Sequence, residues 1–98
     1  MDLGIAGRTA LVTGASGGLG LASAQALASA GVRVALVARS ADRLNAAAAT
    51  VEGDPVTITA DLSQPGDIDD MLTASRQALG GIDILVANAG GPPPGNFA

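Results

Sequence analysis

The chain has 98 residues, of which 48% are hydrophobic and 14% are charged, and it carries a formal net charge of −4. Its length suits one folding unit or part of one, and its composition is too apolar for a disordered chain. It has neither Cys nor His, which excludes disulfides and thiolate metal sites and removes the commonest metal ligand, so we expect no metal. The acidic balance and the single aromatic residue argue against nucleic acid as a partner.

The sequence has no pattern that predicts a membrane segment or a signal peptide. No apolar stretch approaches the roughly 20 residues of a membrane helix. The N-terminal residues 1–4 do not begin a basic region followed by an apolar one. We therefore expect no membrane partner and a cytoplasmic location.

The side chains available for catalysis are few. All five basic residues are Arg, and the chain contains no Lys, Tyr, His, Cys or Trp. A Ser-His-Asp triad, a Cys-His pair, a Schiff-base lysine and a P-loop with its phosphate-binding lysine are therefore impossible within this chain. We predict that it contains no catalytic residue and does not catalyse a reaction by itself.

Hydrophobic patterning predicts strands that alternate with helices. Residues 9–13 form a short apolar run, which is typical of a strand buried on both faces. A helix is predicted over 21–30, with Gly31 just past its end. Its expected buried face consists of small or aliphatic residues: Ala22, Ala26, Leu27 and Ala30. The β-branched run 32–37 predicts a second buried strand.

The second half of the chain continues this alternation. Ser40 is a suitable N-cap for a helix that extends to Val51, and 56–59 is the next predicted strand. A third helix ends at Gly80, and its predicted buried stripe is Ile68, Met71, Leu72, Ser75 and Leu79. Residues 82–87 form the last strand before a Pro-rich loop. The order βαβαβαβ predicts the α/β class, with a doubly wound parallel sheet and right-handed crossovers.

A glycine-rich loop connects the first strand to the first helix. It reads Thr13-Gly14-Ala15-Ser16-Gly17-Gly18-Leu19-Gly20. Glycines let the backbone approach a pyrophosphate closely, and the helix N-terminus that follows offers free N–H groups and a positive dipole. A plain flexible turn is the alternative, but the position between a buried strand and a helix favours dinucleotide binding.

With its Gly-x-x-x-Gly-x-Gly spacing, this loop resembles that of the short-chain dehydrogenase/reductase family. Three further features support the resemblance: the opening residues 3–14, Asp61-Leu62 after the third strand, and Asn88-Ala89-Gly90 after the fourth. The resemblance implies a Rossmann-like sheet of which the first four strands, in the order 3-2-1-4, are present. It makes residues 1–98 the N-terminal dinucleotide-binding half of one Rossmann domain, with no second domain.

The family's cofactor contacts carry over to the matching positions of this chain. The loop residues expected to surround the pyrophosphate and the riboses are Gly14, Ser16, Gly17, Gly18, Leu19 and Gly20. Asp61 would accept a hydrogen bond from the adenine amino group, aided by the backbone of Leu62, with helix capping as the alternative role. Asn88 would tie the central strands together. Ala89 and Gly90 would let the backbone reach the nicotinamide-side ribose, with an ordinary turn as the alternative.

The end of the second strand bears on the choice of cofactor. Proteins that bind a free ribose 2′-hydroxyl usually have an acidic residue there, whereas this chain has Ala38-Arg39-Ser40. The Arg39 guanidinium can pair with a 2′-phosphate, and Ser40 can add its hydroxyl or its N–H. We therefore predict NADP(H) in preference to NAD(H), with a solvated surface Arg as the alternative. Similar NADP-dependent enzymes often have a second basic residue in the glycine loop, and here Gly17 takes that place.

The resemblance also identifies what this chain lacks. In the family, a Ser and a Tyr-x-x-x-Lys pair on later elements move the proton of the substrate, and this chain has neither Tyr nor Lys. One interpretation is the cofactor-binding part of an oxidoreductase that moves hydride between NADP(H) and a small carbonyl or alcohol substrate, and whose full-length form is a homo-oligomer. The alternative is a truncated, non-catalytic product that binds a nucleotide or a partner. A methyltransferase is disfavoured, because such folds usually have an acidic residue where Ala38 and Arg39 stand.

Overall fold

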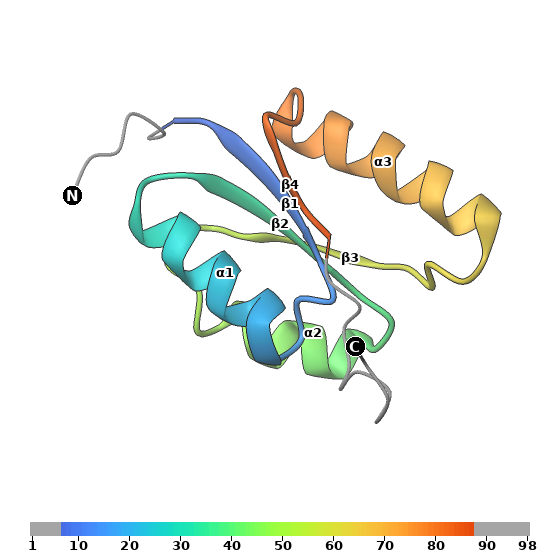
Figure 1. Cartoon of the computed structure of the whole chain (residues 1–98), viewed down its shortest axis with the longest axis horizontal. Coiled ribbons are helices and arrows are strands. Elements are labelled where there is room, and N and C mark those ends of the chain that lie inside the picture. The colour runs from blue at the N-terminus through green and yellow to red at the C-terminus, as the bar shows by residue number, and fades with distance from the viewer. Residues whose placement is uncertain (1–6, 88–98) are drawn as a thin grey trace, which may run out of the picture.

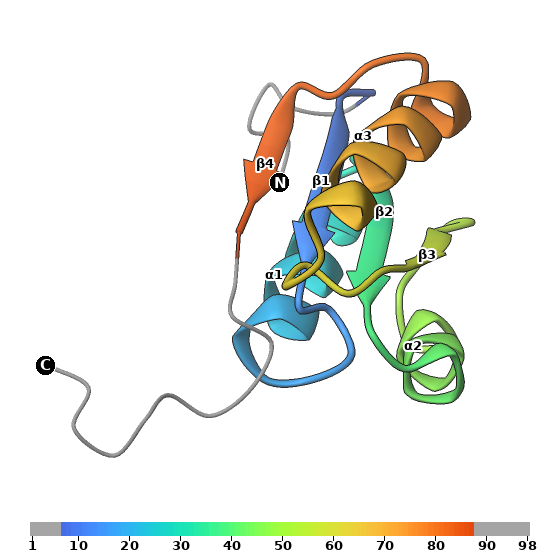
Figure 2. The same cartoon turned by 90° about the vertical axis from the view of Figure 1, so that its right-hand side faces the viewer.

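A computed structural model describes residues 7–87 and confirms the predicted alternation of strands and helices. The strands are β1 (Thr9–Thr13), β2 (Arg33–Ala38), β3 (Val56–Thr59) and β4 (Ile84–Val86), and the helices are α1 (Gly18–Ser29), α2 (Ala41–Ala48) and α3 (Pro65–Leu79). Neighbouring strands are parallel, and the sheet has the predicted order β3-β2-β1-β4. The fold is therefore a Rossmann-like α/β sheet, with α1 and α2 on one face and α3 on the other (Figure 1, Figure 2).

The two central strands, β1 and β2, supply a core on each face of the sheet. All five residues of β1 and five of the six residues of β2 are buried. Because strand side chains alternate between faces, Val12 packs in the same cluster as Ala24 of α1. The neighbouring Leu11 packs on the opposite face, in the cluster that contains Met71 of α3. Burial on both faces explains why these strands are continuous apolar runs.

The caps of α2 and α3 are those that the sequence predicts. Ser40 is the N-cap of α2, and its Oγ accepts a hydrogen bond from the Arg43 N–H at 3.3 Å. α3 ends at Gly80, whose φ of 80° lies in the left-handed region that favours glycine. α2 is shorter than predicted, since it ends at Ala48 and not at Val51. None of the helices within residues 7–87 is long and apolar enough to cross a lipid bilayer.

The prediction for the first helix was wrong in its start and in part of its buried face, although the predicted Leu27 does pack against the core. α1 begins at Gly18, so the end of the glycine loop forms the first turn of the helix. Gly20 and Ala24 are its buried residues. The predicted Ala22 and Ala26 are exposed. An Ala-rich helix has little contrast between its faces, so its apolar periodicity indicated only part of the side that meets the sheet.

β4 lies at the edge of the sheet and is shorter than the predicted 82–87. It pairs with β1 alone among the described strands, through Ala10 with Ile84, Leu11 with Leu85, and Val12 with Val86. Asp83 precedes the strand, and its carboxylate accepts a hydrogen bond from the Thr9 N–H at 3.0 Å. Leu85 is 60% exposed. The sheet therefore has an open apolar edge within the part of the chain that the structure describes.

Candidate functional site

A pocket of about 320 Å³ opens at the carboxyl ends of β1, β2 and β3. Its lining comes from the ends of these strands, the loops after them and the first turn of α2: Gly14, Ser16, Val37, Ala38, Arg39, Ser40, Arg43, Ala60, Asp61, Leu62 and Ser63. Figure 2 shows the loops after β1 and β2 at the same end of the sheet. This crevice is where open α/β sheets bind their ligands.

The structure brings part of the predicted site together around this pocket. The predicted residues that line it are Gly14, Ser16, Arg39, Ser40, Asp61 and Leu62. Residues 17–19 are exposed at the start of α1 and do not line the pocket, and Gly20 is buried in that helix. Residues 88–90 lie outside the described part of the chain. Their assignment, like the cofactor contacts of the other residues, stays a prediction.

Two polar lining residues, Arg43 and Ser63, were missed at the level of the sequence. Arg43 lies in the first turn of α2, three positions after the N-cap Ser40. Ser63 lies two positions after Asp61, which is the spacing of an Asx turn. Each spacing was present in the sequence, but neither shows that the side chain faces a pocket.

The glycine loop is held in a tight conformation between β1 and α1. Gly14 has a φ of 62° and Gly18 a φ of 58°, values in the left-handed region that residues with a Cβ rarely adopt. The Ala15 N–H donates to the Val37 carbonyl at 3.0 Å, which fixes the loop against the end of β2. Within residues 7–87 no side chain caps α1, whose N-cap is Gly17, and its first turn has no acidic residue. The positive end of this helix is therefore available to an anion.

Asp61 is oriented from two sides. Its Oδ1 accepts hydrogen bonds from the Ser63 Oγ at 2.6 Å and from the Ser63 N–H at 3.0 Å. Its own N–H donates to Asp67 Oδ2 at 2.9 Å, in the first turn of α3. The bonds from the Ser63 hydroxyl and N–H lower the pKa of the Asp61 carboxyl below its ordinary 3.8. They outweigh the opposite effect of burial, and the Arg39 charge adds a smaller lowering. Asp61 is thus an ionised acceptor at neutral pH.

The alternative role of Asp61 as a helix cap does not match its contacts. The N-cap of α3 is Gln64, which makes no side-chain capping bond. The Asp61 carboxylate instead bonds Ser63, which precedes the helix. Asp61 therefore stabilises the turn after β3 and keeps its position at the pocket.

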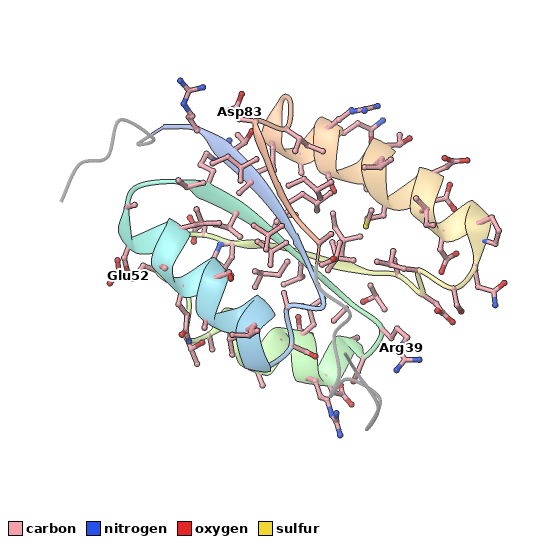
Figure 3. The ribbon with its side chains drawn as sticks, in the orientation of Figure 1. Arg39, Glu52 and Asp83 are labelled. Atoms are coloured by element: carbon pink, nitrogen blue, oxygen red, sulfur yellow. The ribbon has the colours of Figure 1, made fainter. Side chains whose placement is uncertain are left out.

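The pocket is positive although the whole chain is acidic. Its charged lining residues are Arg39, Arg43 and Asp61, which leave one net positive charge in a chain of net charge −4. Figure 3 shows Arg39 at the end of β2, beside the start of α2. Ala38 is 8% exposed and places a methyl group where an acidic side chain would repel a phosphate. The pocket has the charge and donor set that suit an anionic nucleotide.

Comparisons with known proteins agree with this geometry. A family model described as short chain dehydrogenase matches residues 8–98. Glucose 1-dehydrogenase of Gluconobacter oxydans is 40% identical over 89 residues, which cover 87% of this chain and 34% of that protein. The chain is also similar to the crystal structure of L-sorbose reductase from Gluconobacter frateurii, complexed with NADPH and L-sorbose, with 40% identity and a TM-score of 0.86. The matched region covers 93% of this chain and 36% of the reductase chain.

The third similar structure is a variant of actinorhodin polyketide ketoreductase with NADPH, at a TM-score of 0.82 and 32% identity. The matched region covers 94% of this chain and 36% of the ketoreductase chain. The family match over nearly the whole chain and the fold shared with these structures place this protein in a defined class, the short-chain dehydrogenase family. The chain belongs to that family. It spans about a third of the length of the relatives that it matches.

Proposed function

We propose that this chain binds NADP(H) as the cofactor-binding part of an oxidoreductase that interconverts a carbonyl and an alcohol. The observation that carries the proposal is the meeting of Arg39, Ser40 and Asp61 with the glycine loop at one pocket. The net positive charge of that pocket and the absence of a carboxylate at Ala38 favour a cofactor with a 2′-phosphate. Similar proteins whose structures contain NADPH or NADP support the same choice.

The described residues fit the parts of the cofactor as follows. The uncapped end of α1 would hold the pyrophosphate, and residues 17–19, although outside the pocket lining, are exposed beside it. The carboxylate of Asp61, which is ionised and held by Ser63, would accept a hydrogen bond from the adenine amino group. Arg39 would pair with the 2′-phosphate. The Ser40 hydroxyl oxygen already accepts a hydrogen bond from the Arg43 N–H, and its O–H would donate a hydrogen bond to the same phosphate. The bound nicotinamide would supply or accept the hydride.

The remaining parts of the reaction belong to the proposal for the whole protein. The substrate is a small molecule with a carbonyl or alcohol group, the full-length protein is a homo-oligomer, and the location is cytoplasmic. We assign no proton-transfer residue within this chain, because it contains neither Tyr nor Lys. Asn88 would support the central strands, and Ala89 and Gly90 would border the nicotinamide-side ribose. The competing proposal is a chain that binds nucleotide without taking part in catalysis.

Titration of the purified chain with NADPH and with NADH tests the cofactor assignment. We expect tighter binding of NADPH. The double substitution Ala38→Asp with Arg39→Ile should reverse the preference, because it removes the guanidinium and adds a carboxylate, with a loss of about 1.5–3 kcal/mol for NADPH. Tighter binding of NADH by the unsubstituted chain would contradict the role of Arg39. An oxidation assay on the longest protein that contains this chain separates the catalytic from the non-catalytic proposal.

A further inference from the structure

We propose that Arg43 is a second specificity-determining residue, which pairs with the 2′-phosphate of NADP(H) together with Arg39. This inference rests on the proposed function and extends it to a residue that the family motifs do not mark. Arg43 lines the same pocket as Arg39 and Ser40, from the first turn of α2. It offers a second guanidinium to the ligand in a chain whose glycine loop has no basic residue.

The position of Arg43 in its helix is unfavourable in the absence of an anion. It is the third residue of α2, which begins at Ala41 after the N-cap Ser40. The first turn of a helix is its positive end, where acidic side chains stabilise and basic ones destabilise. Asp42 follows this rule and Arg43 does not. A residue that opposes a local rule is a candidate for a functional role, and a phosphate at this helix end would make the guanidinium favourable.

The charges of the pocket give the second argument. Arg39 and Asp61 have opposite charges, and the two residues interact electrostatically. Without Arg43, the charged lining residues would therefore sum to zero. A phosphate monoester carries up to two negative charges, and Asp61 would repel it unless a second cation were present. Arg43 provides the positive charge that makes the pocket attractive to this group.

The backbone around Arg43 fixes the residue near Ser40. The Arg43 N–H donates to the Ser40 Oγ at 3.3 Å, and the Leu44 N–H donates to the Ser40 carbonyl at 2.9 Å. Leu44 itself is 1% exposed and anchors α2 in the core. The first turn of α2 is thus held by these two hydrogen bonds and by the buried Leu44, and Arg43 extends from it to the pocket that Arg39 also lines. A 2′-phosphate is the part of the cofactor that this end of β2 would receive, while the pyrophosphate lies at α1.

The test compares two nucleotides that differ in the 2′-phosphate alone. Adenosine 2′,5′-bisphosphate and adenosine 5′-monophosphate are titrated calorimetrically into the full 98-residue chain and into its Arg43→Gln, Arg39→Gln and Arg76→Gln variants. Arg76→Gln is the control, because it removes the same charge as the other two variants. Arg76 lies in the last turn of α3 and does not line the pocket. Circular dichroism checks that each variant is folded.

We expect Arg43→Gln to weaken the bisphosphate by about tenfold, the loss of one charge-assisted contact, and to change the monophosphate by less than about twofold. Arg76→Gln should change neither. Equal weakening of both nucleotides would overturn the inference, since Arg43 would then act on charge in general. Loss of bisphosphate affinity with Arg39→Gln but not with Arg43→Gln would overturn it and leave the proposed function intact. Failure of the unsubstituted chain to prefer the bisphosphate would overturn both.

Discussion

Single side chains in the pocket determine which chemical groups it can receive. Ser63 is the clearest case, because its hydrogen bonds favour the ionised form of the neighbouring Asp61. Its hydroxyl and its N–H both bond Oδ1 of the carboxylate. Such bonds favour the ionised form, so that the acceptor is charged and already aimed when a donor arrives.

The pKa of Asp61 tests this role of Ser63. We expect Ser63→Ala to raise the pKa toward 3.8, because the hydroxyl bond is the largest cause of its lowering. A group with a lowered pKa in the folded state stabilises the fold above its unfolded value, and this contribution is lost as the pH falls through the folded value. As the pH is lowered below 3.8, the stability that Asp61 contributes should therefore be lost at a higher pH in the variant than in the unsubstituted chain. Carboxyl carbon NMR titration measures the shift, with the exposed Ser29→Ala as the control.

Gly17 offers a test of the pyrophosphate site without backbone strain. Its φ of −179° is open to any residue, and a Cβ there would meet nothing within 4 Å. Gly17→Val should therefore leave the fold intact, apart from about 1 kcal/mol of helix stability at the N-cap. If a phosphate occupies the open space, NADPH affinity should fall by about tenfold in a fluorescence titration.

Gly66→Val is the matched control for this substitution. Gly66 lies in the first turn of α3, and a Cβ there also meets nothing within 4 Å. It does not line the pocket, so NADPH affinity should stay unchanged. Equal affinity of the Gly17 and Gly66 variants would contradict the placement of the pyrophosphate at α1.

At the scale of the elements, a polar cluster of Thr9 and Asp83 joins the start of β4 to β1. Asp83 Oδ2 accepts hydrogen bonds from the Thr9 N–H at 3.0 Å and from the Thr9 Oγ1 at 3.2 Å. The Asp83 N–H donates to the Thr9 carbonyl at 3.0 Å. Figure 3 shows Asp83 at the opposite end of the sheet from Arg39. This cluster therefore fixes the start of β4 without taking part in the pocket.

Removal of the Asp83 carboxylate should loosen β4. Asp83→Ala removes the acceptor of the buried Thr9 N–H, whereas the Thr9 hydroxyl keeps the Gly81 carbonyl at 2.8 Å, so we expect a loss of about 1–3 kcal/mol in the free energy of unfolding. Urea denaturation measures it, and hydrogen exchange should show faster exchange for the amides of 84–86. Asp70→Ala, on the exposed side of α3, is the control. An unchanged midpoint for Asp83→Ala would refute the role of this cluster in holding the strand.

The elements differ in how well their sequences predict them. β1 and β3 have the predicted bounds, because apolar or β-branched runs end there at polar or small residues. The start of α1 was predicted three residues late, since the Gly residues there fit a loop as well as a helix. Ile68 of α3 is 38% exposed although its spacing predicted burial. A spacing gives the face of a helix but not how far the sheet beneath it extends.

The same distinction applies to the site. Arg39 is predicted from its place at the end of the second strand, and Asp61 from the resemblance of Asp61-Leu62 to the family's motif; because the carboxyl ends of parallel strands meet at one edge, both line the pocket. Arg43 was not found, because a basic residue early in a helix usually indicates a solvated surface. Its place at the pocket depends on how α2 packs after β2, which no local sequence pattern contains.

At the scale of the whole molecule, the open edge of the sheet and the acidic charge of the chain have opposite effects on the association of copies. A net charge of −4 keeps copies apart. An unpaired apolar edge strand draws them together by offering free backbone groups and exposed side chains. Within the described residues β4 is such an edge, with Leu85 60% exposed. The balance depends on protein concentration and on salt, because salt screens the repulsion and leaves the apolar contact.

We therefore expect the 98-residue chain to associate in a concentration-dependent way that added salt strengthens. Leu85→Lys should weaken the association constant by about tenfold or more, because it removes roughly 1.5–3 kcal/mol of side-chain burial and places a charge on the edge. Leu19→Lys is the discriminating control, since Leu19 is 78% exposed but lies on α1 and not on β4. Light scattering over a concentration series measures both. If Leu19→Lys reduced association as much as Leu85→Lys, exposed apolar side chains in general would be responsible, and the edge of β4 would have no special role.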